Sequence, residues 1–247
     1  MTAVWSRDER RWVPFGAVPR RWWAEAALAA GFAAVTVLLL WPSWLVDVDV
    51  AVRDFCLGHH ATPLFWTARV LTFAGQGLPL SLICLGLAAW LSRRHRTIRP
   101  LLPVAAAYVV LALVLGVKDW MDRVPPRFPT GHAPYVDAAG SVLFSGQGAS
   151  SYPSGHGANT AVWYGLIVLL CGAALSATWR RVLLVAPPLV SLSAQLYLGY
   201  HWLSDSVAGY LLGWLIIRAV RRVPWDRVGL SARFGRGGGR RGRGAVD

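Results

Sequence analysis

The sequence predicts an all-α fold, a six-span bundle of transmembrane helices. Two observations lead to this prediction. Of the 247 residues, 55% are hydrophobic, only 15% are charged and 14 are tryptophan. Long runs without a charged residue recur, for example at 26–41, 109–117 and 160–177. Such a composition is typical of multi-span membrane proteins, and it excludes a disordered chain, a collagen-like chain and a disulfide scaffold.

Six segments approach the length of about 20 apolar residues that a helix needs to cross the hydrocarbon core of a bilayer. They cover about 22–41, 70–91, 101–119, 155–177, 182–200 and 203–222. The first could instead be the core of a secretory signal, because basic residues precede it. Its length and the Trp41-Pro42-Ser43-Trp44 sequence that follows favour a retained span. Pro187 and Pro188 interrupt the fifth segment, where neighbouring helices can satisfy the freed backbone groups.

Arginines concentrate on one side of the predicted spans. They fill the N-terminal segment, the connections between spans two and three and between spans four and five, and the C-terminal region. Because cytoplasmic loops carry the excess of cations, both termini are predicted to be cytoplasmic in a multi-pass cell-membrane protein. The chain then divides into a basic N-terminal segment (1–21), a membrane domain (22–222) and a Gly/Arg-rich tail (223–247) that we expect to be disordered. We expect that tail to face anionic lipid and not nucleic acid.

Several polar residues lie where the predicted spans reach the outer side. Lys118 is the only lysine in the chain, and it directly follows an apolar run. Taken alone it could be a residue that extends to the interface. The outer loop after it ends in Pro153-Ser154-Gly155-His156, where Ser154 suits a helix N-cap and His156 the first turn. The free N–H groups of a helix start favour a bound anion, to which His156 could donate a proton.

A second histidine, His201, lies at the outer end of the fifth span. If this region is helical, His201 and Asp205 are four residues apart and share a face. An acid beside one imidazole nitrogen fixes the tautomer and leaves the other nitrogen free to attack a substrate. Alternatively, the pair only ties a helix end. Since the topology brings both histidines, Lys118, Ser154 and Asp205 to the same membrane face, a shared site is the better interpretation. No motif in the sequence indicates a metal or another cofactor.

At these residues the chain resembles the type 2 phosphatidic acid phosphatase superfamily of membrane lipid phosphatases. The family motifs are Lys-x6-Arg-Pro, Pro-Ser-Gly-His and Ser-Arg-x5-His-x3-Asp. The second matches at 153–156, the third at His201 and Asp205, and the first at Lys118 and Pro126. The resemblance implies that His201 is the nucleophile that forms a phosphohistidine, that Asp205 orients it, and that His156 is the general acid. It also implies that Lys118, Ser154 and Gly155 bind the phosphate.

Two family arginines are replaced. Pro125 stands at the arginine position of the first motif, and Ala194 and Gln195 replace the Ser-Arg pair of the third. Two guanidinium groups that would hold phosphate are therefore missing. Arg123 and Arg127 flank Pro125 and could substitute for them, and Gln195 keeps a neutral hydrogen-bond donor.

Three functions remain open at this point. The first is hydrolysis of a polyprenyl or glycerolipid phosphate or diphosphate at the outer leaflet, without a metal. The second is lipid phosphotransfer similar to that of sphingolipid synthases, which also have two histidines and an aspartate without the third-motif arginine. The third is a catalytically silent lipid-binding protein. The presence of His156, His201 and Asp205 together favours an enzyme. The sequence indicates no oligomeric state.

Overall fold

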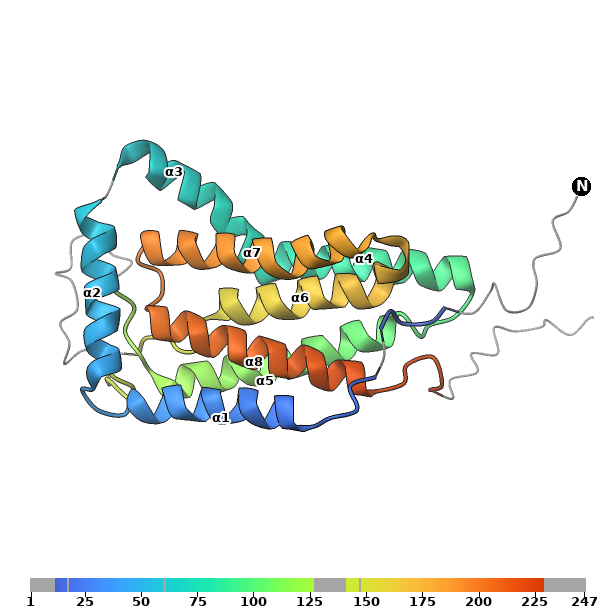
Figure 1. Ribbon diagram of the computed structural model, residues 1–247, viewed down its shortest axis with the longest axis horizontal. Coiled ribbons are helices and arrows are strands. Elements are labelled where there is room, and N and C mark those ends of the chain that lie inside the picture. Colours follow the sequence, from blue (N-terminus) through green and yellow to red (C-terminus); the bar gives the residue numbers. More distant parts are fainter. Residues whose placement is uncertain (1–11, 17, 60, 127–140, 147, 229–247) are drawn as a thin grey trace, which may run out of the picture.

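The computed structural model describes residues 12–16, 18–59, 61–126, 141–146 and 148–228, and within these ranges the chain is helical with no strand. Six long helices run side by side, and the shorter α2 and α3 lie at one end and along one side (Figure 1). The helices are α1 (Trp23–Leu38), α2 (Trp44–Gly58), α3 (Thr62–Leu71), α4 (Gly77–His95), α5 (Leu101–Met121), α6 (Gly155–Cys171), α7 (Ala177–Tyr197) and α8 (Leu203–Arg222), with a 3₁₀ turn, η1 (Thr72–Gly75), before α4. The prediction of an all-α fold is confirmed.

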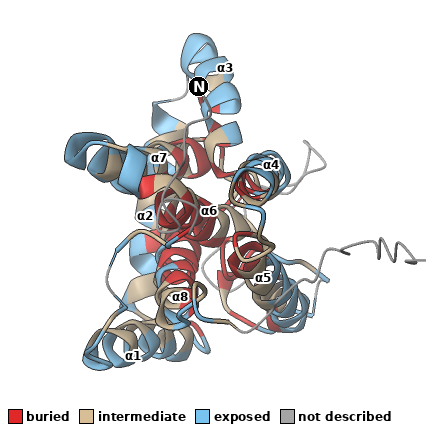
Figure 2. Cartoon of the chain, turned by 90° about the vertical axis from the view of Figure 1, so that its right-hand side faces the viewer, coloured by how far each residue is buried: buried red, intermediate tan, exposed pale blue. Residues whose placement is uncertain are grey.

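Helix α6 forms the centre of the bundle. Figure 2 shows its buried residues surrounded by α4, α5, α7 and α8, while the outer faces of α1, α3 and α5 are exposed. Small residues let α6 and α8 approach closely. A Cβ on Gly165 would lie 2.6 Å from Ile217, and one on Gly213 would lie 2.7 Å from the Cβ of Ala161. The close contact of α6 and α8 positions the two helix starts that carry the candidate site.

The exposed surface of the helices is strongly apolar. Large hydrophobic side chains such as Leu78, Val109 and Leu113 have more than half of their surface exposed. By length and composition, α5, α8 and the stretch Gly155–Ala174 can each cross a membrane. The stretch Thr62–Gly75 and α4 make a fourth candidate if the pair, bent by 42°, counts as one span. The chain is therefore a membrane protein with three to four candidate spans by this measure, fewer than the six segments predicted.

The two remaining predicted segments are also helical, but neither meets the criterion of length and composition for a membrane-spanning helix. Helix α1 is apolar but has only 16 residues. Helix α7 has 21 residues and remains continuous through Pro187 and Pro188, but its first turns carry Arg180 and Arg181. The second predicted segment, 70–91, is not one continuous helix. It begins at the end of α3 and includes η1, and α4 begins only at Gly77.

Helices α2 and α3 lie in a region where the sequence predicts no helix. Charged residues interrupt α2, so it contains no apolar run long enough to cross a membrane. A search for apolar runs of that length therefore does not find it. In Figure 1, α2 crosses the end of the bundle where α5 and α7 finish and α6 and α8 begin. Its residue Asp49 is 1% exposed and reaches the start of α8. His59 follows the last residue of α2, and His60 lies outside the described residues.

The two ends of the bundle differ in charge. Most arginines of the described residues lie at the end where α5 and α7 begin and where α4, α6 and α8 finish, among them Arg93, Arg99, Arg180 and Arg221. The opposite end, which α2 crosses, carries Lys118 and both histidines of the predicted site. The predicted termini, residues 1–11 and 229–247, lie outside the described residues.

Candidate active site

The start of α6 forms one side of the site. Ser154 is the N-cap, and its hydroxyl oxygen accepts a hydrogen bond from the Gly157 N–H at 3.2 Å. Helix α6 begins at Gly155, so the predicted cap and helix start are confirmed. The backbone N–H of Ser154 donates to the carbonyl oxygen of Asp205 at 2.9 Å. This bond fixes the start of α6 against the first turn of α8.

The two histidines of the predicted site face one another. The ring centroids of His156 and His201 are 5.7 Å apart, with the ring planes inclined by 68°. His156 lies in the first turn of α6 and is partly exposed, whereas His201 is only 6% exposed. The sequence predicted His201 at a helix end, but it lies in the turn between Tyr197, where α7 ends, and Leu203, where α8 begins.

Asp205 and Ser151 surround one nitrogen of the His201 ring. The His201 Nδ1 atom is 3.7 Å from Asp205 Oδ2 and 3.3 Å from Ser151 Oγ. The Ser151 hydroxyl donates to the same carboxylate oxygen at 2.5 Å, and the Trp202 N–H donates to it at 3.0 Å. Burial lowers the pKa of His201 below its usual range, and Asp205 partly opposes this shift. Burial thus favours the neutral ring, in which Nε2 is the nitrogen that does not face Asp205 and Ser151.

Arg123 lies on the other side of Asp205. Its side chain is fully buried and donates to Asp205 Oδ1 at 2.5 Å, to Asp49 Oδ2 at 2.7 Å, and to the Ser141 carbonyl and the Ser204 hydroxyl. Its guanidinium thus holds two carboxylates inside the protein. This contact differs from the predicted one, in which Arg123 binds phosphoryl oxygens directly.

Asp49 is a part of the site that the sequence did not connect to it. Its Oδ1 accepts from the Ser204 N–H at 2.9 Å, and its Oδ2 accepts from the Ser204 hydroxyl and from Arg123. Burial raises the pKa of Asp49, and the Arg123 charge opposes the rise. A carboxylate between Val48 and Val50 was the available signal, although Asp47, Arg53 and Asp54 also lie in α2. Ser151, in the loop before α6, carried no such signal.

Lys118 reaches the start of α6 from the end of α5. Its Nζ atom lies 3.9 Å from the point that a Cβ on Gly155 would occupy. Within the described residues, no carboxylate forms an ion pair with it. A cation above the first turn of a helix adds to the positive end of the helix dipole. The ammonium group and the first turn of α6 together make a local anion-binding environment.

Gln195 fixes the end of α7 to the same place. The Gln195 side chain is fully buried; its Oε1 accepts from Ser154 Oγ at 2.6 Å, and its Nε2 donates to the carbonyl and hydroxyl oxygens of Ser191, each at 2.9 Å. Ser154 is also fully buried. Both side chains are therefore occupied with protein groups and hold the backbone around Gly155 and His156.

One more cation approaches His201. Arg53 of α2 lines a small cavity of about 10 Å³ together with His201 and Pro126, and its side chain is 12% exposed. Arg127, predicted as a phosphate ligand, lies outside the described residues. Within the described residues, no group of three or more His, Cys, Asp or Glu side chains could hold a metal ion.

Comparisons with known proteins identify the family of the chain. Residues 99–228, more than half of the chain, match the PAP2 superfamily. The chain is 28% identical over 181 residues to a lipid A 4'-phosphatase of Bacteroides thetaiotaomicron, a match that covers 69% of this chain and 74% of that protein.

A solved structure shares the fold. The crystal structure of a transmembrane PAP2-type phosphatidylglycerolphosphate phosphatase from Bacillus subtilis superposes with a TM-score of 0.64 at 22% identity. The superposition covers 80% of this chain and 94% of that one. The matched range 99–228 contains Lys118, His156, His201 and Asp205. The chain belongs to the PAP2 superfamily.

Proposed function

We propose that the protein hydrolyses a lipid phosphate or diphosphate, of the polyprenyl or glycerolipid class, at the outer face of the membrane through a phosphohistidine on His201. The observation that carries this proposal is the pair of imidazole rings 5.7 Å apart, of which one has a carboxylate beside its Nδ1 atom. Two such rings can act on the same phosphorus, one as nucleophile and one as acid.

In the first step, His201 Nε2 attacks phosphorus and the bond from phosphorus to the leaving oxygen breaks. His156, in its protonated form, donates a proton to that oxygen, so the dephosphorylated lipid leaves as an alcohol or, from a diphosphate, as a monophosphate. The phosphorylated ring carries positive charge, which Asp205 at 3.7 Å stabilises.

In the second step, water attacks the phosphohistidine. His156, now neutral, takes a proton from this water, and the bond between nitrogen and phosphorus breaks to release phosphate. His201 returns to its neutral form, and His156 is again protonated. This exchange of acid and base roles restores the starting state with no proton left over.

The phosphoryl oxygens are bound in this proposal by groups that face the start of α6. Lys118 supplies a charge, and the Gly155 and His156 N–H groups of the first turn supply donors directed along the helix dipole. Arg53 of α2 lines the small cavity beside His201 and adds positive charge there, while its guanidinium is paired with Asp54. Arg123, Ser154 and Gln195 act as positioning residues, because their polar atoms already bind protein groups.

The membrane arrangement is part of the proposal. We place α1, α4, α5, α6, α7 and α8 as six spans, with the arginine-rich end in the cytoplasm and the histidines outside. The short α1 is supported by Trp22 and Trp41 at its ends, where interfacial tryptophans anchor helices. We retain the predicted division into residues 1–21, 22–222 and 223–247.

The names of the relatives fit this activity. One is described as a lipid A 4'-phosphatase and the other as a phosphatidylglycerolphosphate phosphatase. Both names indicate that a phosphate is removed from a lipid in a membrane. The lipid itself is the point on which the two differ.

The test is phosphate release by the purified full-length protein in detergent. We would offer polyprenyl diphosphate, phosphatidic acid and phosphatidylglycerol phosphate, each with and without a chelator. We expect release from at least one lipid, no effect of the chelator, and no release by His201→Ala. The matched control His59→Ala removes an exposed histidine at the end of α2 and retains activity. Turnover by His201→Ala contradicts the nucleophile assignment.

The same assay separates the alternatives. A new phosphodiester lipid formed when an alcohol is supplied, in place of free phosphate, indicates a phosphotransferase. Lipid binding without either product indicates a catalytically silent protein. Either outcome contradicts hydrolysis as the function.

A further inference from the structure

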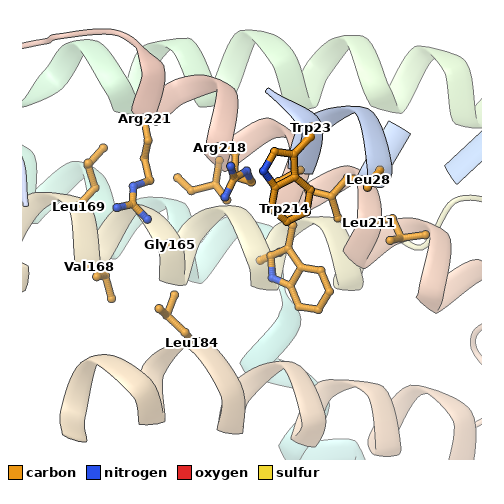
Figure 3. Close-up of a pocket in the computed structure, with 14 residues that line it drawn as sticks. Trp23, Leu28, Gly165, Val168, Leu169, Leu184, Leu211, Trp214, Arg218 and Arg221 are labelled. Atoms are coloured by element: carbon orange, nitrogen blue, oxygen red, sulfur yellow. The ribbon is translucent and has the colours of Figure 1, made fainter. Parts of the chain in front are cut away.

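A second cavity lies far from the histidines, in the arginine-rich half of the bundle. It has a volume of about 620 Å³ and lies between α1, α6, α7 and α8. Figure 3 shows Gly165, Leu184, Trp214 and Arg218 along it, with Arg221 toward one end. Arg221 is 16 residues beyond Asp205 along the same helix, which corresponds to roughly 24 Å at 1.5 Å per residue. The arginine end of the cavity therefore lies far from the candidate active site, and no residue of that site lines the cavity.

Small side chains create this groove. Ala24 and Ala27 of α1 and Ala161 and Gly165 of α6 all line it, and none of the four has a side chain large enough to fill the space between the helices. Figure 2 shows α1 and α7 standing apart on the same side of α6 and α8. The lining is otherwise apolar, and Leu184 on the α7 side is 39% exposed. In a membrane, an open apolar groove of this kind is filled by hydrocarbon.

The end of the groove carries excess positive charge. Glu25 of α1 binds Arg222 at 2.9 Å and Arg218 at 3.3 Å, so a single carboxylate serves two guanidinium groups. Arg221 lies against the backbone of Gly16, where its Nη2 atom is 2.5 Å from the position of a Cβ. No hydrogen bond or ion pair to Arg221 occurs within the described ranges. Arg218 thus shares its carboxylate with Arg222, and Arg221, at the mouth of the apolar groove, has no anionic partner among the described residues.

These features point to an amphipathic anion. Guanidinium groups bind phosphate with two parallel hydrogen bonds. Basic pockets between membrane helices on the cytoplasmic side bind anionic headgroups. We propose that this groove is a binding site for one anionic phospholipid, with its phosphate on Arg221 and an acyl chain along Gly165 and Leu184. The inference needs only the membrane location of the bundle and does not rest on the proposed hydrolysis.

The protein's own termini are poor candidates for this place. Residues 1–11 carry three arginines against Asp8 and Glu9, and residues 229–247 carry five arginines against Asp247, so each segment would add net positive charge to a site that already has an excess. A zwitterionic phospholipid offers the same acyl chains but no net negative charge. The site therefore distinguishes lipids by headgroup charge.

The test compares the thermal stability of the delipidated full-length protein in neutral detergent with added phosphatidylglycerol or phosphatidylcholine of the same acyl chains. We expect phosphatidylglycerol to raise Tm more than phosphatidylcholine, because a ligand that binds only the folded state stabilises it. In Arg221→Gln the extra increment from phosphatidylglycerol should be lost, while the phosphatidylcholine increment stays. The control Arg93→Gln removes an exposed arginine at the same end of the bundle and should keep both increments.

A second variant tests the groove without changing charge. Leu184→Trp places a larger side chain in the space for the acyl chain, and we expect it to reduce the increments from both lipids. Equal Tm increments from the two lipids in the unmodified protein contradict the proposal. So does a full phosphatidylglycerol increment in Arg221→Gln. If Arg221→Gln does not fold, native mass spectrometry of the unmodified protein decides: one retained phosphatidylglycerol per chain supports the site, and none overturns it.

Discussion

The Arg123 guanidinium donates to Asp205 at 2.5 Å from a position with no solvent exposure. Asp205 is the acid beside His201, so Arg123 fixes the second oxygen of a carboxylate whose first oxygen serves the candidate nucleophile. Asp49 of α2 binds the same guanidinium at 2.7 Å. The three groups together carry one net negative charge next to His201. A buried set of this kind holds its geometry because each member lacks water as an alternative partner.

Removal of Arg123 should destabilise the protein strongly. Arg123→Gln leaves Asp49 and Asp205 buried without their cation, and breaking a buried ion pair costs about 3–5 kcal/mol. Thermal unfolding in detergent measures this loss. The control Arg94→Gln removes an exposed arginine at the end of α4 and should leave Tm nearly unchanged. Equal Tm values for the two variants would contradict the structural role of Arg123.

The loss should be partly reversed by a second substitution. Arg123→Gln combined with Asp49→Asn removes one of the two stranded carboxylates, so the double variant should unfold at a higher temperature than Arg123→Gln alone. Residues in one ion-pair network show coupling of this kind. Simple addition of the two single effects would show that Asp49 and Arg123 act independently.

Ser151 should affect the rate more than substrate binding. Its hydroxyl donates to Asp205 and lies beside His201 Nδ1. A hydrogen bond to a charged group contributes about 1.5–3 kcal/mol, so Ser151→Ala should lower kcat roughly 10- to 100-fold with little change in KM. Ser151→Thr should restore part of the rate. The control Ser193→Ala removes an exposed hydroxyl of α7 and should be silent. An unchanged kcat in Ser151→Ala would contradict a role of Ser151 in orienting Asp205 and His201.

Gln195 and Ser154 should act as one unit. Gln195→Leu leaves the buried Ser154 hydroxyl without its acceptor, which costs about 1–3 kcal/mol. The start of α6 then loses its tie to α7, and both Tm and kcat should fall. In a Ser154→Ala background the same substitution should cost much less. If the effects of Gln195→Leu and Ser154→Ala on Tm simply add, Gln195 does not stabilise the start of α6 through Ser154.

The stability of the protein should fall in mild acid because of His201. Burial lowers the pKa of His201 in the folded protein, whereas in the unfolded chain the group titrates near its usual value of about 6.5. As the pH falls through that value the unfolded chain takes up the proton first, so the free energy of unfolding decreases. His201→Asn should flatten this dependence between about pH 7 and pH 5, and His59→Asn should not. Identical slopes in the unmodified protein and His201→Asn would show that His201 accepts the proton in the folded state.

The sequence predicted which residues come together at the site better than it predicted the residues that hold them there. Pro153-Ser154-Gly155-His156 and the spacing of His201 and Asp205 identified the site because those residues are local signals: a cap, a first turn and a fixed separation. The role of Arg123 depends on Asp49, which lies 74 residues earlier in the chain, and no spacing rule links the two. Arg123 was expected to bind phosphate because it lies two residues before the motif position Pro125. In the structure its guanidinium instead donates to Asp205 and Asp49.

The helices, like the site residues, were predicted where the sequence carries a local signal and missed where it does not. Apolar length located every long helix of the bundle, since a bilayer requires it. It missed α2, because an amphipathic helix lying across the end of a bundle needs no continuous apolar run, and it missed most of α3, which has only 10 residues. The number of spans also depends on more than apolar length, as the 16-residue α1 and the proline-containing α7 show.

The most direct test of the account is a search for a phosphorylated histidine. We would mix the full-length protein with a ³²P-labelled aryl phosphate, quench in base and map the label by mass spectrometry. An aryl group leaves without help from an acid, so His156→Ala should still form the intermediate and accumulate it. We expect label on His201 in this variant and none in His201→Asn. Turnover with no label on His201, or label retained in His201→Asn, contradicts the proposed mechanism.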